Sequence, residues 1–154
     1  MQTLVVGHRS LAKTVILGGL TVGVLDTLLA IGLYRVSPFI IYQSIAGGFF
    51  GRSTYQHGWE TAALGCFLHF FIATTAAGIY VIASRYLPVL VKHAIACGMA
   101  YGVVVYAFMN YVVIPMSAIT HRQKPLWELM GGLMGHIFLV GLPIGLIARR
   151  YSRV

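Results

Sequence analysis

The chain has 154 residues and a formal net charge of +8; 58% of its residues are hydrophobic and only 9% are charged. A soluble domain carries about 25% charged residues, so this composition excludes an ordinary soluble domain and indicates an integral membrane protein. The basic residues are scattered singly and form no patch, so the expected partner is the lipid bilayer and not a nucleic acid.

Four apolar segments are long enough to cross a bilayer, which takes about 20 residues. They cover roughly 13–34, 59–84, 92–114 and 127–148. The N-terminus has its charges after a short apolar run and no small-residue cleavage site, so we expect no cleaved signal peptide there. We predict one all-α domain over 1–154, an integral membrane four-helix bundle.

The stretch between the first two spans, SPFIIYQSIAGGFFGR at 37–52, is apolar but too short to cross a membrane. Ser37 is a good helix cap, and Pro38 suits a first helical turn. We therefore predict a short interfacial or re-entrant helix after the first span. Pro115 is expected to mark the end of the third span.

The distribution of positive charge predicts an orientation for the bundle. If the N-terminus lies inside, seven basic residues lie on the inner side and four on the outer side. The inner set is Arg9, Lys13, Arg85, Lys92, Arg149, Arg150 and Arg153, and the outer set is Arg35, Arg52, Arg122 and Lys124. We therefore predict that both termini are cytoplasmic and that 37–58 lies outside.

The second and fourth spans share an order of residues: Trp-Glu at the start, Gly four residues before His, and Ile-Ala-x-Arg-Tyr at the end. Lys13, Gly19 and Gly23 likewise have the spacing of Lys92, Gly98 and Gly102. We predict two hairpin repeats, 13–86 with 37–58 as an insertion and 92–151, related by an axis along the membrane normal. Because the Glu-to-His spacing differs by one residue, chance similarity of apolar helices is the alternative.

Each Trp-Glu pair has a simple interpretation. Trp59 and Trp127 fit an aromatic belt at the outer interface. Glu60 and Glu128 fall in a first helical turn, where a negative charge meets the positive end of the helix dipole. The alternative is an outer vestibule, to which the third span would add Tyr106 and Asn110.

Three residues lie deep in the predicted spans. At about 1.5 Å per residue, His69 and His136 are roughly 14 Å below the outer face, and Asp26 is within about a turn of that depth. Ionisable groups at such depth usually face protein or water. Small residues one turn away, such as Gly65 and Gly132, point the histidines into the bundle. We therefore predict a buried polar cluster of Asp26, His69 and His136.

Several roles compete for this cluster. It can fix helix register by hydrogen bonding, act as a protonatable relay or ion site, ligate haem b through His69 and His136, or form a metal site of the two histidines with Asp26. No nucleotide-binding loop, zinc motif or catalytic triad appears, so no enzyme is expected. We predict transport or conduction of a proton or small solute. The alternative is a non-catalytic subunit or assembly partner of a larger membrane complex, or a homo-oligomer.

Five runs carry a resemblance: GVLD, SPFIIYQSIAGGFFG, AALGCFLHFFIA, YGVVVYAFMNYVVIPMSA and GHIFLVGLPIGLIARR. They resemble small four-helix proteins of the proteobacterial inner membrane, in particular the YagU-like family, which combines Gly-His pairs within apolar helices. Members of that family are longer, and the insertion pattern here differs. The resemblance implies a bacterial inner-membrane location and a link to acid tolerance, but no residue roles.

Overall fold

The computed structural model describes residues 8–119 and 123–151, and these ranges are almost entirely helical. The elements in chain order are α1 (His8–Tyr34), α2 (Pro38–Phe50), η1 (Gly51–Gln56), α3 (Gly58–Tyr86), α4 (Val89–Lys92), α5 (Ala94–Phe108), η2 (Met109–Val113), α6 (Leu126–Gly135), η3 (His136–Gly141) and α7 (Leu142–Tyr151). Four continuous stretches have the length and composition to cross a membrane, namely Leu11–Tyr34, Gly58–Tyr86, Ala94–Val113 and Leu126–Tyr151. The four predicted spans are therefore confirmed.

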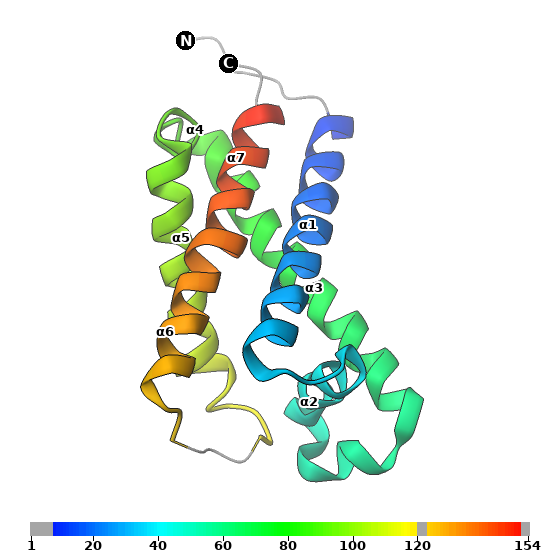
Figure 1. The fold of residues 1–154 in the computed structure, drawn as a ribbon. Helices are drawn as coiled ribbons and strands as arrows, with labels where there is room; N and C mark the ends of the chain where they lie inside the picture. The colour runs from blue at the N-terminus through cyan, green and yellow to red at the C-terminus, as the bar shows by residue number, and fades with distance from the viewer. Residues whose placement is uncertain (1–7, 120–122, 152–154) are drawn as a thin grey trace.

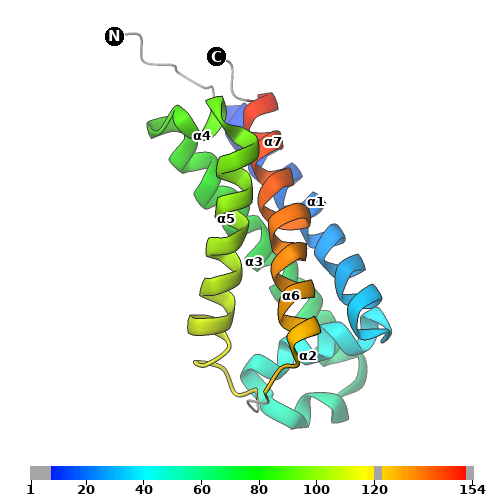
Figure 2. The same cartoon turned by 60° about the vertical axis from the view of Figure 1, so that its left-hand side comes forward.

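The bundle has two different ends. The start of α1, the end of α3, α4 and the end of α7 lie together at one end, which we call the terminal end (Figure 1). The other end, the loop end, carries α2, η1 and residues 114–119 (Figures 1 and 2). An even number of spans places the start of α1 and the end of α7 on the same side of a membrane.

Neighbouring spans approach closely because glycines lie at their contacts. A Cβ at Gly19 of α1 would meet the backbone of Thr74 in α3, 2.6 Å from its Cα. A Cβ at Gly98 of α5 would lie 2.8 Å from the backbone oxygen of Gly141 in the fourth span. Such close backbone contact is typical of membrane helices, whose association depends on packing and not on water exclusion. The spans thus form two tight pairs, α1 with α3 and α5 with the fourth span.

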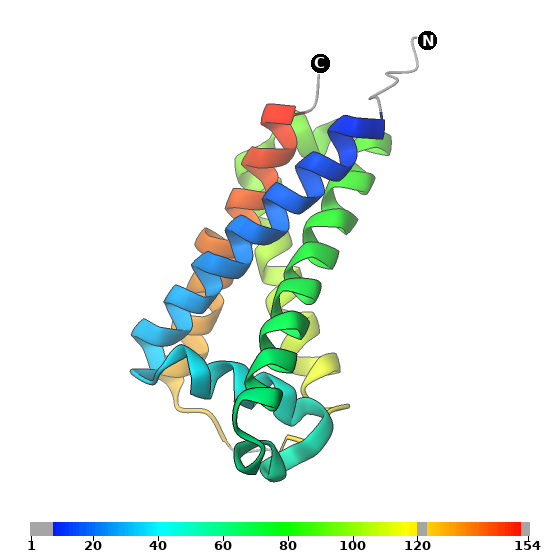
Figure 3. The same cartoon turned by 90° about the vertical axis from the view of Figure 1, so that its right-hand side faces the viewer.

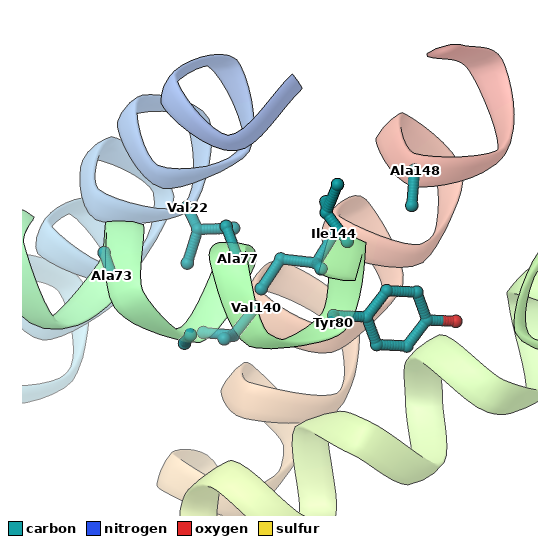
Figure 4. Close-up of a cluster of buried hydrophobic side chains, with 9 residues drawn as sticks. Val22, Ala73, Ala77, Tyr80, Val140, Ile144 and Ala148 are labelled. Carbon is teal, nitrogen blue, oxygen red and sulfur yellow. The ribbon is translucent and has the colours of Figure 1, made fainter. Parts of the chain in front are cut away.

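The hydrophobic core is concentrated toward the terminal end. It consists of Val22, Ala73, Ala76, Ala77, Tyr80, Val81, Val140, Ile144 and Ala148, which we call the terminal core. Figure 4 shows these side chains, which come from α1, α3 and the fourth span, with the Tyr80 ring at one side of the cluster. The Tyr80 hydroxyl donates to the Leu90 carbonyl at 3.0 Å, and Tyr101 of α5 donates to the Ala76 carbonyl at 2.8 Å. Both buried hydroxyls are thereby satisfied.

The short helix α2 is tied to the start of α3 by a buried polar corner. Ser37 caps α2 as predicted, accepting from the Ile40 N–H at 3.4 Å. Gln43 is 2% exposed and donates to the Gly58 carbonyl at 3.1 Å, while Thr54 donates to the Gln43 carbonyl at 2.9 Å. A 13-residue helix cannot span a bilayer, so α2 covers the loop end of the bundle.

Two spans contain π-helical segments, Met109–Val113 and His136–Gly141, each ending two residues before a proline. The N–H of Ile114, before Pro115, donates to the Met109 carbonyl five residues back at 2.9 Å. The N–H of Leu142, before Pro143, reaches back five residues to the Ile137 carbonyl. Proline lacks an N–H and its ring collides with the carbonyl four residues earlier, so the helix widens there. The second segment begins at His136 and therefore sets the direction of that side chain.

The two helix pairs separate toward the loop end. In Figure 1, α3 crosses behind the other spans and runs away from α5 and α6, and Figure 3 shows α1 and α3 also diverging at this end. The pairs remain joined where α1 packs against α7 and η3. This divergence leaves space inside the loop-end half of the bundle.

Candidate functional site

A cavity of about 290 Å³ occupies that space, and we call it the central cavity. Its lining includes Asp26 from α1, His69 from α3 and His136 from η3, so the three ionisable residues of the predicted cluster meet the same space. Tyr106 and Asn110 line it as well. All five side chains are half-buried, as expected for groups that border a cavity within the bundle.

His69 is fixed by a hydrogen-bond network with α1 and α2. Its Nε2–H donates to the Gly23 carbonyl at 2.8 Å, because a carbonyl can only accept. The Thr27 hydroxyl donates to the same carbonyl at 2.8 Å and lies 3.1 Å from Nε2. Tyr42 then donates its hydroxyl to Thr27 Oγ1 at 3.2 Å. Neutral His69 therefore carries its proton on Nε2, and Nδ1 is an acceptor.

His136 is fixed in the opposite tautomer. Its Nδ1–H donates to the Gly132 carbonyl, one turn earlier in the same span, at 2.9 Å. The Tyr106 ring meets the imidazole edge to face, with centroids 5.3 Å apart, and the Tyr106 hydroxyl donates to the Leu129 carbonyl at 3.0 Å. The acceptor nitrogen of neutral His136 is therefore Nε2.

Asp26 shares the central cavity with the two histidines but is not hydrogen-bonded to them. Neither histidine forms a hydrogen bond with its carboxyl group, because the proton-bearing nitrogens of both donate to backbone carbonyls. Within the described residues, no fully enclosed side-chain nitrogen or oxygen lacks a hydrogen-bond partner. The Asp26 oxygens, His69 Nδ1 and His136 Nε2 therefore remain accessible, and the central cavity is the space that all three residues line.

A second cavity of about 520 Å³, the mouth cavity, adjoins the first at the loop end. The two share part of their lining, including Tyr34, Lys124 and Glu128. Glu128 is only 4% exposed and accepts from the Tyr34 hydroxyl at 3.0 Å. Lys124 donates to Asn110 Oδ1 at 2.8 Å. These two contacts lie where the mouth cavity meets the central cavity.

Of the four residues considered for an outer vestibule, three line the central cavity and one does not. Glu128, Tyr106 and Asn110 do so. Glu60 is exposed and lines neither cavity, although it occupies the first turn of α3 as Glu128 does of α6. Glu60 and Glu128 therefore do not share either of these cavities. Glu60 begins the span that leans away from the others, so its side chain faces outward.

The central cavity is closed toward the terminal end. Its inner lining includes Val22, Ala73, Ala76 and Val140, all of which belong to the terminal core. The central cavity therefore extends from the mouth cavity to Asp26 and the histidines, and a packed apolar layer lies beyond them.

The geometry bears on both the metal hypothesis and the haem hypothesis. Within residues 8–119 and 123–151, no three His, Cys, Asp or Glu side chains are close enough to hold a metal ion, so the site of two histidines with Asp26 is not formed there. For haem, each imidazole keeps one nitrogen free of backbone hydrogen bonds, but it is Nδ1 in His69 and Nε2 in His136. A bis-histidine site would have to use these two different nitrogens.

Sequence reasoning missed four side chains of this site, Thr27, Tyr34, Tyr42 and Lys124. Thr27 follows Asp26 directly and, at helical spacing, shares the Gly23 face, so its position was available from the pattern. Tyr42 and Lys124 approach from α2 and from the segment before α6, and nothing in the sequence indicates how those segments fold back. Tyr34 is the last residue of α1, where a helix end is hard to place.

Neither a family model, nor a curated protein sequence, nor a solved structure matches this chain.

Proposed function

We propose that this protein transports or conducts a proton or small solute across a bacterial inner membrane, with Asp26, His69 and His136 forming the binding site. One observation carries the proposal: Asp26, His69 and His136 line one cavity that adjoins the mouth cavity at the loop end and is closed toward the terminal end, and the acceptor atoms that they leave unbonded are not enclosed. In a cluster with only a structural role, these atoms would form hydrogen bonds with one another, because unsatisfied polar groups are costly inside a membrane.

The geometry supports a cycle with one-sided access. A proton or solute entering from the loop end passes the Tyr34–Glu128 contact and meets Asp26 and the two imidazoles. Release on the other side requires the terminal core to part. The two helix pairs meet chiefly where α1 contacts α7 and η3, so rocking about this seam is the motion that would move the closed region from one end to the other.

Flux measurements with the purified protein in liposomes test the proposal. An internal pH-sensitive dye reports proton entry under an imposed pH gradient. Asp26→Asn is expected to reduce the flux to that of empty liposomes while leaving the thermal unfolding midpoint within a few degrees. Glu60→Gln is the matched control, because Glu60 is exposed and lines neither cavity; its flux should equal that of the unmodified protein. Equal flux through the unmodified protein, Asp26→Asn and Glu60→Gln would contradict a role for Asp26 in transport.

The internal repeat remains part of the proposal. Gly19 and Gly23 of α1 contact Thr74 and Phe70 of α3, and the corresponding Gly98 and Gly102 of α5 contact Gly141 and His136 of the fourth span. In each half the second glycine therefore lies beside the histidine: Gly23 accepts from His69, and Gly102 faces the His136 carbonyl. These equivalent contacts support two parallel hairpin repeats.

The proposal includes a location in the membrane. Both termini are expected in the cytoplasm, and the resemblance to the YagU-like family agrees with an inner-membrane location.

The two alternative functions have their own tests. The visible absorption spectrum of the purified protein decides the haem alternative: a Soret band that is lost in His69→Ala and His136→Ala would replace transport by haem binding. A larger complex, the other alternative, would be detected as co-purifying subunits at fixed stoichiometry.

A further inference from the structure

A third cavity opens sideways between α3 and α5, and we call it the lateral groove. Its volume is about 350 Å³, and its lining is Phe71, Ile72, Thr75, Ala76, Ile79, Tyr101, Val104, Val105, Phe108, Met109 and Val113. From Tyr101 to Val113 the groove follows about 18 Å of helix at 1.5 Å per residue. It lies within the spanning parts of both helices, so it opens to the hydrocarbon region of the bilayer.

The lateral groove is apolar in its chemistry. Only two of its lining side chains carry polar atoms, and both are satisfied internally: Thr75 donates to the Phe71 carbonyl at 2.8 Å, and Tyr101 donates to the Ala76 carbonyl at 2.8 Å. The outward-facing Phe71, Val104 and Phe108 are more than half exposed. The groove therefore suits a hydrocarbon chain and offers it no polar partner.

The lateral groove and the central cavity lie back to back. Four residues line both of them, Ile72 and Ala76 on α3 and Val105 and Met109 on α5. Met109 is unbranched and flexible, so its displacement is the easiest way to connect the two spaces. A molecule lying in the groove would then have its chain in an apolar slot and its head next to Asp26, His69 and His136.

The central cavity selects the chemistry of that head. Around it, side-chain donors are already used on protein acceptors: Tyr34 on Glu128, Tyr106 on the Leu129 carbonyl, and each imidazole N–H on a backbone carbonyl. Lys124, at the mouth, donates to Asn110. Lys124 keeps two further ammonium hydrogens, so the acceptors that favour a cation are those deeper in the cavity, namely the Asp26 oxygens, His69 Nδ1 and His136 Nε2. Such a set favours a cation that brings its own hydrogens.

We propose that the solute of this site is a lipophilic primary amine, which enters from the bilayer through the lateral groove and places its ammonium group against Asp26 in the central cavity. This inference rests on the proposed role of the central cavity as a binding site, and it adds the substrate class and the route of entry. The chain supplies affinity by burial of apolar surface, and the ammonium supplies charge-assisted hydrogen bonds to the carboxylate.

Photolabelling tests the proposal on the full-length protein in phosphatidylcholine nanodiscs. The probe is decylamine with a diazirine at the apolar end of its chain, and labelled positions are read by mass spectrometry. Labels are expected on residues 71–79 and 101–113. Excess decylamine should remove them, and an equal excess of decanoate, which carries the opposite charge, should not. Equal labelling of all lipid-facing surfaces, or equal displacement by decanoate, would overturn the proposal.

Two comparisons make the test more specific: Asp26→Asn with the unmodified protein, and Val104→Trp with Val103→Trp. Asp26→Asn should weaken binding of the probe by at least about tenfold, since it removes a charged hydrogen-bond acceptor. Val104→Trp and Val103→Trp are matched, because both are exposed valines of α5 and only Val104 lines the groove. The first should abolish labelling of 71–79, and the second should preserve it; identical labelling in the two would contradict entry through the groove.

Failure of this inference is distinguishable from failure of the proposed function. Specific labelling with a proton flux that is insensitive to Asp26→Asn would leave the amine site standing and remove proton transport. A flux that depends on Asp26, in a protein that decylamine neither labels nor inhibits, would leave transport standing and remove the amine.

Discussion

At the scale of single residues, the site depends on which atoms are already bonded. Gly23 has a backbone carbonyl that accepts from two side chains, His69 and Thr27, and Tyr42 adds a third group from α2. This network fixes the tautomer of His69 and leaves its other nitrogen, Nδ1, unbonded. The orientation of a candidate proton-carrying group is thus set by neutral neighbours.

Thr27→Val tests this network with little change of shape. It removes a hydroxyl that donates to the Gly23 carbonyl, accepts from Tyr42 and lies beside His69. Because net hydrogen-bond contributions in membranes are small, we expect the free energy of unfolding to fall by about 1–2 kcal/mol. Thr75→Val is the control, since the Thr75 hydroxyl donates only to the Phe71 carbonyl of its own helix, and should change stability by less than about 0.5 kcal/mol. Equal losses in unfolding titrations would argue against a cooperative network.

At the scale of helices, glycine contacts determine how closely the spans pack. Gly19 and Gly98 each face backbone atoms of a neighbouring span, which cannot move aside as a flexible side chain does. Gly32, near the end of α1, has nothing within 4 Å of the position its Cβ would take. The same residue type therefore has a packing role at two positions and none at the third.

Gly19→Ala and Gly98→Ala are each expected to destabilise the protein by about 1–3 kcal/mol, because an added methyl group forces two backbones apart. Similar losses at these two positions would also support the internal repeat, in which they are equivalent. Gly32→Ala should leave stability unchanged or raise it by up to about 1 kcal/mol, since alanine is the better helix former. Chemical unfolding in detergent micelles measures all three; a loss at Gly32 as large as at Gly19 would refute the packing argument.

At the scale of the whole molecule, the orientation in the membrane decides which side the mouth cavity faces. The positive-inside distribution predicts a cytoplasmic terminal end, and with it a mouth cavity that faces the outer side. Ser53 lies at the loop end and Arg150 at the terminal end, and both are exposed. A thiol introduced at either position therefore reports the side directly.

We expect Ser53→Cys to react with a membrane-impermeant thiol reagent in intact bacterial cells and Arg150→Cys to react only after permeabilisation. The background for both is Cys66→Ala with Cys97→Ala, which removes the two native free cysteines. The opposite pattern of labelling would reverse the orientation and turn the mouth cavity toward the cytoplasm.

The spans were predictable from sequence because the physics behind them is local. A span requires about 20 apolar residues to cross a bilayer, and Ser37 followed by Pro38 indicates the start of a helix. The π-helical segments were missed although Pro143 signals one, because a proline in a span indicates disturbed hydrogen bonding without saying how the helix adjusts.

The membership of the candidate site was partly predictable and its bonding was not. Depth and neighbouring small residues identified Asp26, His69 and His136 as inward-facing. Their hydrogen-bond partners depend on side-chain rotamers and on the path of α2 and of the segment before α6, which bring Tyr42 and Lys124 to the site. The contrast between Glu60 and Glu128 arises from the lean of α3, a property of the packed bundle that neither Trp-Glu pair encodes.

The closed terminal core has an electrical consequence. The central cavity is bordered by the ionisable residues Asp26, His69 and His136, so we expect water from the loop end to enter it. The membrane potential then falls mainly across the thin apolar layer around Tyr80, where each elementary charge moved through 100 mV exchanges about 2.3 kcal/mol. If the protein transports protons as proposed, we expect protonation at Asp26 to be nearly independent of voltage and the step through the terminal core to carry almost the full voltage dependence.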